Sequence, residues 1–204
     1  LDWCVGQLVS KLKQLDRLDE TLIIFTSDNG PVVDDGYHDG AVENLRDHRP
    51  AGPWRGGKYS NFSAGTRVPW ITAWPGHVTP GVSDALVSQV DLLRSLADLV
   101  DESLPTDVAR DSQDILPTIL GQSTKGRQQL VLQASTLSLR DGAWKLIPAQ
   151  KGPAINRNVN IELGNFGTAQ LFDLESDPGE ATNVAAENPD RVRRMQQILA
   201  EILQ

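Results

Sequence analysis

Two neighbouring oxygen donors, the carboxylate of Asp28 and the amide of Asn29, follow a short apolar run after Thr26 and Ser27. That run, Leu22-Ile23-Ile24-Phe25, is too short for a helix and is typical of a parallel strand buried on both faces. Asn29-Gly30-Pro31 then turns the chain just past the carboxyl end of the strand. Ligands of open α/β sheets bind at that edge, and hard oxygen donors suit Ca²⁺ or Mg²⁺. We therefore expect a divalent-cation site at Asp28 and Asn29, although a plain turn would use the same residues.

Charges are segregated along the next part of the chain. Residues 28–47 carry six acidic side chains against the single base Arg46, whereas residues 48–83 carry four bases and no acid. A cation-binding segment followed by an anion-binding segment is what metal-assisted chemistry on a charged oxyester requires. The metal polarises an oxygen of the reacting group, and fixed cations offset its remaining charge. A solvated basic face is the alternative interpretation of the same pattern.

The loop Arg55-Gly56-Gly57-Lys58 is the candidate anion site within the basic segment. Its two glycines let the backbone approach an anion closely, and the Lys58 ammonium can act as a mobile point charge. We expect Arg55 and Arg67 to brace the loop through ion pairs, and a substrate contact by Arg55 stays open. His38 and His48 lie in polar segments, where a histidine either contacts a substrate or is simply solvated.

The elements that must position these residues alternate helix and strand in the first part of the chain. Hydrophobic spacing predicts an amphipathic helix over residues 2–18, a second buried strand over residues 68–74, and a helix from about residue 83 to 100. A polar linker over residues 121–128 follows. We expect an α/β fold in which residues 1–125 form the C-terminal part of a larger core.

Residues 126–204 contain several short strand candidates in succession, and they predict a small antiparallel sheet with a packed C-terminal helix. Asp141-Gly142 is a hairpin signal, residues 152–165 predict a mobile Asn-rich loop, and Asn188-Pro189 is typical of a helix start. The strand candidates are residues 130–134, 137–140, 144–147 and 170–174.

The composition is that of an ordinary globular chain, with 39% hydrophobic and 23% charged residues. The net charge of −8 disfavours a nucleic-acid or acidic-membrane binder, and no apolar run is long enough to span a bilayer. Cys4 is the single cysteine, so no internal disulfide can form, and its place in the first helix predicts a buried structural thiol. Because the chain starts without Met inside a predicted helix, we expect it to be a fragment.

An ordered set of short motifs extends over nearly the whole chain. They are Thr21-Leu22-Ile23-Ile24-Phe25-Thr26-Ser27-Asp28-Asn29-Gly30, Arg55-Gly56-Gly57-Lys58, Gly65-Thr66-Arg67-Val68-Pro69, Trp74-Pro75-Gly76, Val87-Ser88-Gln89-Val90-Asp91-Leu92-Leu93, Trp144-Lys145-Leu146-Ile147, Leu171-Phe172-Asp173-Leu174 and Asp177-Pro178-Gly179-Glu180. Each motif alone is weak, but the ordered set is specific. It resembles the C-terminal portion of a sulfatase of the arylsulfatase type, in the alkaline-phosphatase superfamily.

The resemblance implies an alkaline-phosphatase-like α/β core and the hydrolysis of sulfate esters on small molecules or carbohydrates. In that family the aspartate and asparagine after this strand bind a divalent cation, usually calcium, which corresponds to Asp28 and Asn29. The lysine of the Gly-Gly-Lys loop contacts the substrate sulfate, which corresponds to Lys58. Family habit also suggests export to the periplasm or the cell exterior.

Two departures from the family pattern stand out. Ser63-Ala64-Gly65 occupies the place where Glu-Gly-Gly often precedes the arginine. The Cys/Ser-x-Pro-x-Arg motif that yields the formylglycine nucleophile does not occur in this sequence, and Cys4 lacks the proline and arginine. The family's nucleophile and two further metal-binding carboxylates would therefore come from a missing N-terminal half, and we expect the fragment alone to be inactive.

Two other functions stay open at this point. One is a phosphodiesterase or phosphonate hydrolase, which shares the metal-assisted logic, and the other is a non-catalytic module that binds anionic glycans. Turnover of an aryl sulfate well above that of an aryl phosphate diester would favour the sulfatase. The expected partners are a sulfated substrate and the missing half of the same protein, and a homo-oligomer stays open.

Overall fold

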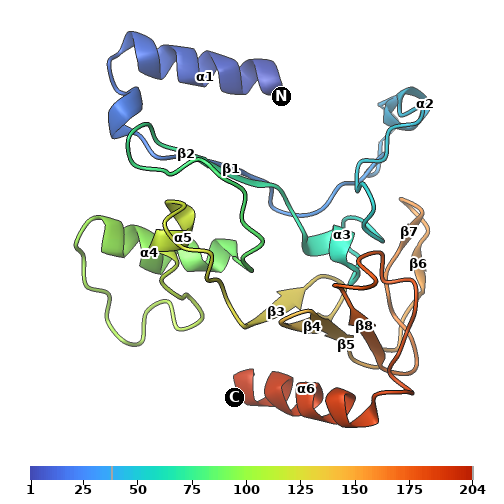
Figure 1. The fold of residues 1–204 in the computed structure, drawn as a ribbon. Coiled ribbons are helices and arrows are strands. Elements are labelled where there is room, and N and C mark those ends of the chain that lie inside the picture. Colours follow the sequence, from blue (N-terminus) through green and yellow to red (C-terminus); the bar gives the residue numbers. More distant parts are fainter. Residues whose placement is uncertain (38, 204) are drawn as a thin grey trace. The chain divides into compact units, whose positions relative to one another are not determined.

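The computed structural model describes residues 1–37 and 39–203, and their contacts group them into two compact units. Unit 1 comprises Leu1–Thr26 and Pro69–Arg127, and unit 2 comprises Ser27–Val68 and Gln128–Gln204 (Figure 1). The division into a core part, residues 1–125, and a C-terminal subdomain, residues 126–204, stays a prediction.

The small sheet of unit 1 consists of β1 (Ile23–Thr26) and β2 (Trp70–Ala73). Both strands agree with the sequence prediction. The expected parallel pairing is wrong for the described residues, because β1 runs antiparallel to β2 with Ile23 opposite Ala73, and β1 is only half-buried. An apolar run indicates a strand, but the direction of its partner depends on how the chain returns many residues later.

The first helix, α1 (Asp2–Gln14), is shorter than the predicted span of residues 2–18 and leads into the 3₁₀ turn η1 (Leu18–Glu20). None of its side chains is buried, and Trp3 remains 73% exposed. Cys4 is exposed as well, so the predicted burial of this thiol is wrong. The apolar face of α1 therefore lies open in the described chain. Among the described residues, no helix has both the length and the apolar character that crossing a membrane requires.

The helix predicted from about residue 83 begins later than expected. A 3₁₀ turn, η2 (Gln89–Asp91), leads into α4 (Leu92–Leu99), and the short α5 (Leu116–Ile119) follows. Ser88 forms a capping box with Asp91, whose Oδ2 accepts from the Ser88 backbone N at 3.1 Å. The fully buried Asp91 also pairs with Arg127. These contacts fix the helix start at Ser88, which hydrophobic periodicity alone does not reveal.

Unit 2 contains the predicted antiparallel sheet, in the strand order β3-β4-β5-β8. Its strands are β3 (Gln129–Gln133), β4 (Leu137–Asp141), β5 (Trp144–Ile147) and β8 (Gln170–Asp173). The predicted hairpin at Asp141-Gly142 joins β4 to β5, with Asp141 opposite Trp144. The last helix, α6 (Pro189–Ile202), lies along this sheet in Figure 1. Its buried residues Met195 and Leu199 form a core with Leu139, Leu146 and Leu171.

Residues 152–165, predicted to form a loop, contain regular secondary structure. It contains the short hairpin of β6 (Ile155–Asn156) and β7 (Ile161–Glu162). The buried Leu163 follows, and its backbone N donates to Ala154 O at 2.7 Å. The Asn-rich composition indicates turns, whereas the burial of Leu163 holds the segment against the rest of unit 2.

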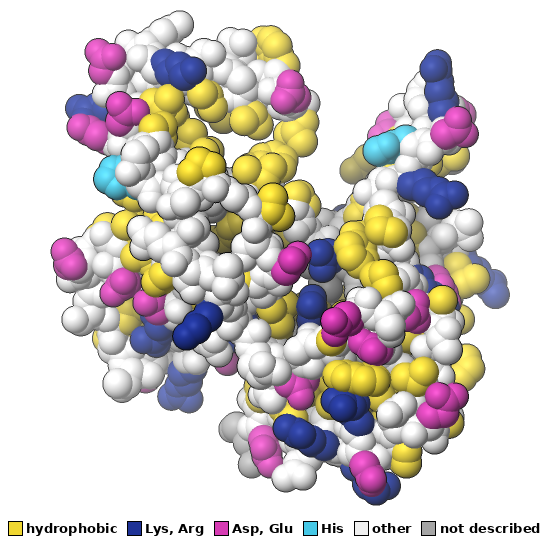
Figure 2. All heavy atoms as spheres, in the orientation of Figure 1, with side chains coloured by type: hydrophobic (Ala, Val, Ile, Leu, Met, Phe, Trp, Pro, Cys, Tyr) yellow, Lys and Arg dark blue, Asp and Glu magenta, His cyan; other side chains and the backbone are white. Residues whose placement is uncertain are grey.

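The remaining helices of unit 2, α2 (Ala41–Asn44) and α3 (Ser63–Thr66), are single turns within the long segment between residues 27 and 68. On the face shown in Figure 2, acidic and basic side chains are interspersed. The candidate site residues all fall within this segment of unit 2.

Candidate active site

Two backbone hydrogen bonds join the turn after β1 to the loop that carries Lys58. Gly30 N donates to Gly65 O at 3.0 Å, and Lys58 N donates to Pro31 O at 2.9 Å. The first bond fixes the turn that contains Asp28 and Asn29. The second fixes the backbone at Lys58. The residues predicted to bind a cation and an anion, far apart in sequence, are thus held by one backbone framework.

The close approach of the two segments depends on the absence of side chains at two glycines. A Cβ atom at Gly30 would lie 1.5 Å from Ala64 O, and a Cβ atom at Gly57 would lie 2.7 Å from Pro31 O. Both distances are shorter than any van der Waals contact, so only glycine fits without moving the backbone. Gly57 is therefore needed for the packing of the loop, whether or not an anion also binds close to its backbone.

Asp28 and Asn29 present oxygen donors at the turn. Asp28 is exposed, and its Oδ1 accepts from the Asn29 backbone N at 3.0 Å. The Asn29 side-chain Nδ2 donates to Gly30 O at 2.9 Å, and its Oδ1 accepts no hydrogen bond from another described residue. Asp28 Oδ2 is likewise without a donor among those residues. Carboxylate and amide oxygens left open in this way fit a Ca²⁺ or Mg²⁺ ion.

These two residues would supply only part of a coordination shell. Among the described residues, no group of three or more His, Cys, Asp or Glu side chains is placed to hold a metal. Ca²⁺ takes six to eight oxygen ligands as a rule, so further donors would have to come from elsewhere. The cation site at Asp28 and Asn29 stays a prediction.

Lys58 is paired with a carboxylate that the sequence analysis did not single out. Its Nζ lies 2.6 Å from Asp35 Oδ2, and the side chains of Lys58 and Asp35 are 28% and 26% exposed. Tyr59 OH donates to the other carboxylate oxygen, Asp35 Oδ1, at 2.9 Å. The hydrogen bond to Asp35 raises the pKa of Lys58, and the hydrogen bond from Lys58 lowers the pKa of Asp35. Contact of Lys58 with a substrate anion stays a prediction.

Arg55 makes the ion pair that was expected to brace the loop. Its Nε and Nη2 donate to both oxygens of Glu162 at 2.8 and 2.6 Å, a bidentate geometry. Nη1 donates to the backbone O of Glu180, and the guanidinium lies 3.9 Å from the centre of the Phe62 ring. With its donors committed in this way, Arg55 has a bracing role, and its contact with substrate stays a prediction.

Arg67 does not form the expected ion pair among the described residues. Its guanidinium stacks on the Trp54 ring instead, with the guanidinium carbon 4.1 Å from the ring centroid. Such a cation–π contact braces the loop from its other end. The possible substrate contacts of His38 and His48 stay predictions. His48 is exposed, and His38 lies outside the described residues.

A buried ion pair fastens the same loop to the antiparallel sheet. Lys145 and Glu180 are both 0% exposed, and Lys145 Nζ lies 2.8 Å from Glu180 Oε1, an ion-pair distance without the angle of a hydrogen bond. Glu180 Oε2 accepts from Ser63 N at 2.5 Å. Burial lowers the pKa of Lys145, and the charge of Glu180 opposes that shift. The backbone N of Ser63 and the Lys145 ammonium are thus both held by the Glu180 carboxylate.

Phe62 anchors the loop in the core of unit 2. It is 1% exposed and packs with Ile147 and Phe172, with a distance of 5.9 Å between the two phenylalanine ring centroids. The sheet therefore holds the Lys58 loop in place. Residues that make these contacts come from two of the sequence motifs, Trp144-Lys145-Leu146-Ile147 and Asp177-Pro178-Gly179-Glu180.

Comparison with known proteins identifies the family and the fold of this chain. The family model described as Sulfatase matches residues 1–102, which is half of the chain. The chain belongs to the sulfatase family. The resemblance inferred from the ordered motifs is confirmed. The α/β fold of a sulfatase C-terminal part, with its small antiparallel sheet and packed helix, is confirmed by the structural match below.

Two curated relatives and one solved structure define the similarity. The sulfatase chain is 46% identical to an N-acetylgalactosamine-6-O-sulfatase of Bacteroides thetaiotaomicron over 99% of its own length and 40% of that protein. It is 33% identical to Homo sapiens arylsulfatase A over 97% of its own length and 41% of that protein. A solved structure from "Metabolism of multiple glycosaminoglycans by bacteroides thetaiotaomicron" matches with a TM-score of 0.96 at 46% identity, over 98% of this chain and 42% of that one. The chain thus spans about 40% of the length of these curated relatives.

The glycine contact at the turn leads to a stability prediction for the full-length sulfatase. Gly30→Ala should lower the free energy of unfolding by about 1–3 kcal/mol, because the added methyl group would overlap Ala64 O and separate the turn from the loop. Gly6→Ala is the matched control, since a Cβ atom at that position in α1 meets nothing within 4 Å and alanine favours a helix. Denaturant unfolding of both variants measures the difference, and a Gly30→Ala protein as stable as wild type would show that the contact is not tight.

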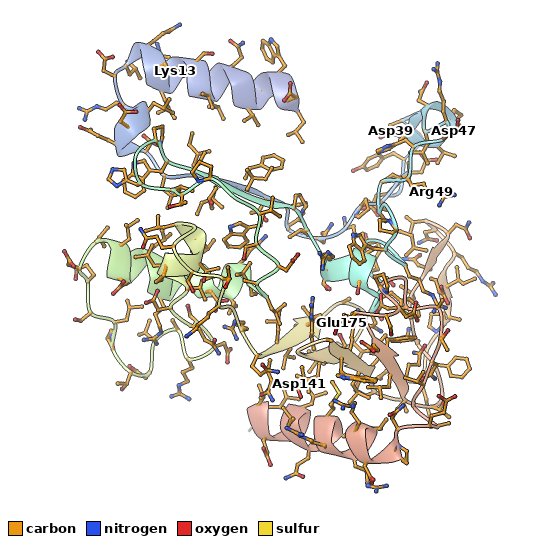
Figure 3. All side chains as sticks on the ribbon, in the orientation of Figure 1. Lys13, Asp39, Asp47, Arg49, Asp141 and Glu175 are labelled. Atoms are coloured by element: carbon orange, nitrogen blue, oxygen red, sulfur yellow. The ribbon has the colours of Figure 1, made fainter. Side chains whose placement is uncertain are left out.

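The buried carboxylate leads to a second stability prediction. Glu180→Ala should cost about 3–5 kcal/mol of unfolding free energy, because it leaves the Lys145 ammonium buried without its counter-ion and Ser63 N without its acceptor. Glu175→Ala is the control. It removes an exposed carboxylate just after the end of β8, labelled in Figure 3, and should change the free energy of unfolding by less than about 0.5 kcal/mol. Thermal unfolding of the two variants under identical conditions tests this, and equal effects would contradict the anchoring role of Glu180.

Proposed function

We propose that the full-length protein hydrolyses 6-sulfate esters of N-acetylgalactosamine in sulfated glycans. The observation that supports this substrate class is the 46% identity over 99% of the chain to a protein named for that activity. Homo sapiens arylsulfatase A, which is 33% identical, is also named as a sulfatase. Neither the phosphodiesterase alternative nor a non-catalytic glycan-binding module gains support from these relatives.

In this proposal Asp28 and Asn29 hold a divalent cation, with Ca²⁺ favoured over Mg²⁺. The support is the pair of open hard-oxygen donors at a turn whose backbone is fixed by Gly30. Such an ion, when bound, supplies a positive charge that polarises a sulfate oxygen. The chain contributes the position of the donors, which the Gly30–Gly65 hydrogen bond sets, and the remaining ligands come from the rest of the protein.

Lys58 binds the sulfate group of the substrate. Its ammonium carries three donors in total, and Asp35 engages one side of it, so donors remain for an anion. Negative charge on the sulfate group shifts toward the leaving oxygen as the ester bond breaks, and a fixed ammonium stabilises that charge. The backbone bond from Lys58 N to Pro31 O holds the base of the side chain during this step.

The nucleophile is a formylglycine in the part of the protein that precedes this chain. No Cys/Ser-x-Pro-x-Arg motif occurs in the printed sequence, and the single cysteine, Cys4, is exposed on α1. The present chain would therefore provide two cation ligands and one anion contact, and it would have no activity by itself.

The assay that tests the proposal uses the full-length protein with N-acetylgalactosamine 6-sulfate and its 4-sulfate isomer. We expect sulfate release from the 6-sulfate, with kcat/KM reduced roughly 10²–10³-fold in Lys58→Ala, the range seen on removal of one preorganised charge partner. Asp28→Ala should also lose turnover but recover in part at high Ca²⁺, because a weakened metal site fills by mass action. Added Ca²⁺ should not restore Lys58→Ala, whose lost contact is to the substrate.

Lys151→Ala is the control, since Lys151 is exposed and forms no hydrogen bond or ion pair with another described residue. It should keep wild-type turnover. Sulfate release from the 4-sulfate alone would overturn the proposed substrate class. Recovery of Lys58→Ala by Ca²⁺, or an unchanged kcat/KM in that variant, would contradict the anion-binding role.

A further inference from the structure

Asp35 holds the polar groups of two successive side chains on the candidate anion loop. Its Oδ2 pairs with Lys58 Nζ at 2.6 Å and its Oδ1 accepts from Tyr59 OH at 2.9 Å. Lys58 Nζ also lies 5.2 Å from the Tyr59 ring centroid. One carboxylate oxygen of Asp35 therefore pairs with the lysine that the proposed function assigns to the sulfate, and the other is held by Tyr59.

The backbone directs Asp35 to this place. Asp34 and Gly36 on either side have positive φ angles of 55° and 92°, and Gly36 N donates to Asp34 O at 2.7 Å. Left-handed conformations flanking a residue reverse the chain tightly, and few residue types tolerate them. The neighbouring bond from Lys58 N to Pro31 O holds the other segment. The backbone conformation on each side thus positions Asp35 and Lys58 for their contact.

The pair is placed where a ligand can reach it. The Lys58 and Asp35 side chains are 28% and 26% exposed, so neither is sealed in the core of unit 2. Their mutual hydrogen bond keeps the pKa of Asp35 below and the pKa of Lys58 above its ordinary value. Both groups are therefore charged at neutral pH, and together they carry no net charge while still offering N–H donors.

A lysine paired with a carboxylate favours a doubly charged anion less strongly than an unpaired lysine would. A sulfate ester carries one negative charge, whereas a phosphate monoester carries nearly two above a pH of about 6. Each ligand charge beside Lys58 is also repelled by the Asp35 carboxylate, so that repulsion is about twice as large for the phosphate ester. The attraction of an unpaired lysine would favour the more highly charged ligand more strongly.

We propose that Asp35, acting through Lys58, shifts the selectivity of this site toward singly charged sulfate esters and away from doubly charged phosphate monoesters. The inference rests on the proposed function, in which Lys58 contacts the sulfate. Asp35 is a selectivity residue here and need not touch the substrate. A purely structural role for Asp35, as an anchor of the loop, would change turnover of both ester classes by the same factor.

The test uses the full-length protein and its Asp35→Asn variant, assayed with 4-nitrophenyl sulfate and 4-nitrophenyl phosphate at about pH 8, where the phosphate ester is doubly charged. Asparagine keeps the size and a hydrogen-bonding oxygen but removes the charge. We expect the ratio of kcat/KM for sulfate to that for phosphate to fall roughly tenfold, the scale of one removed charge a few ångströms from the ligand. If phosphate turnover is too slow, the ratio of the inhibition constants of phenyl phosphate and phenyl sulfate measures the same discrimination at the level of binding.

Two further variants control the result. Asp47→Asn removes one negative charge from the same segment, beside α2 in Figure 3, and Asp47 has no hydrogen bond or ion pair with another described residue. It should leave the ratio unchanged, which separates a local effect from a change in net charge. Asp35→Glu keeps the charge and should keep a ratio close to wild type, provided that thermal unfolding shows a folded protein.

The outcomes for Asp35 and for the proposed function are distinguishable. An unchanged ratio in Asp35→Asn, with Lys58→Ala impaired on the aryl sulfate, would overturn the selectivity role and leave the proposed function standing. An equal fall for both esters would assign Asp35 a structural role and also overturn it. Unimpaired aryl sulfate turnover in Lys58→Ala would refute the anion site itself.

Discussion

The backbone contact between the turn after β1 and the Lys58 loop is the constraint on which the rest of the candidate site depends. The hydrogen bonds from Gly30 N to Gly65 O and from Lys58 N to Pro31 O join segments about thirty residues apart. Only glycine at positions 30 and 57 lets these two segments of the backbone come this close. A cation site on one segment and an anion site on the other can act on one sulfate group only if such a framework holds them.

The C-terminal sheet of unit 2 helps to hold this framework in place. Phe62 is buried against Ile147 and Phe172, and Glu180 is held between Ser63 N and the Lys145 ammonium. Buried charges are costly unless they are paired, so their presence at this junction indicates that geometry matters more there than stability alone. That view is a hypothesis, which the stability and turnover of Glu180 variants address together. It gives the distant motif ending at Glu180 a role in positioning the Lys58 loop.

Local sequence patterns predicted the elements that depend on local physics. The strands around Leu139, Leu146 and Leu171 and the helix containing Met195 followed from apolar spacing and from the turn signal Asp141-Gly142. The parallel direction of β1 was wrong because the partner strand is not encoded in the run itself.

The side-chain partners were the part that the sequence did not reveal. Asp35 was counted only as one acid in an acidic segment, and its contact with Lys58 depends on two left-handed residues beside it. Lys145 within a strand suggests an exposed side chain, whereas its burial requires Glu180, which lies far along the chain. The ordered motifs nevertheless identified the family, because their order carries information that no single spacing contains.

A crystal structure of the full-length protein with Ca²⁺ and a bound sulfate ester tests the central claim most directly. The account predicts that oxygens of Asp28 and Asn29 ligate the cation at roughly 2.3–2.6 Å, and that Lys58 Nζ donates to the sulfate group while the Gly30–Gly65 hydrogen bond persists. A cation bound away from Asp28 and Asn29, or a sulfate group out of reach of Lys58, would contradict it.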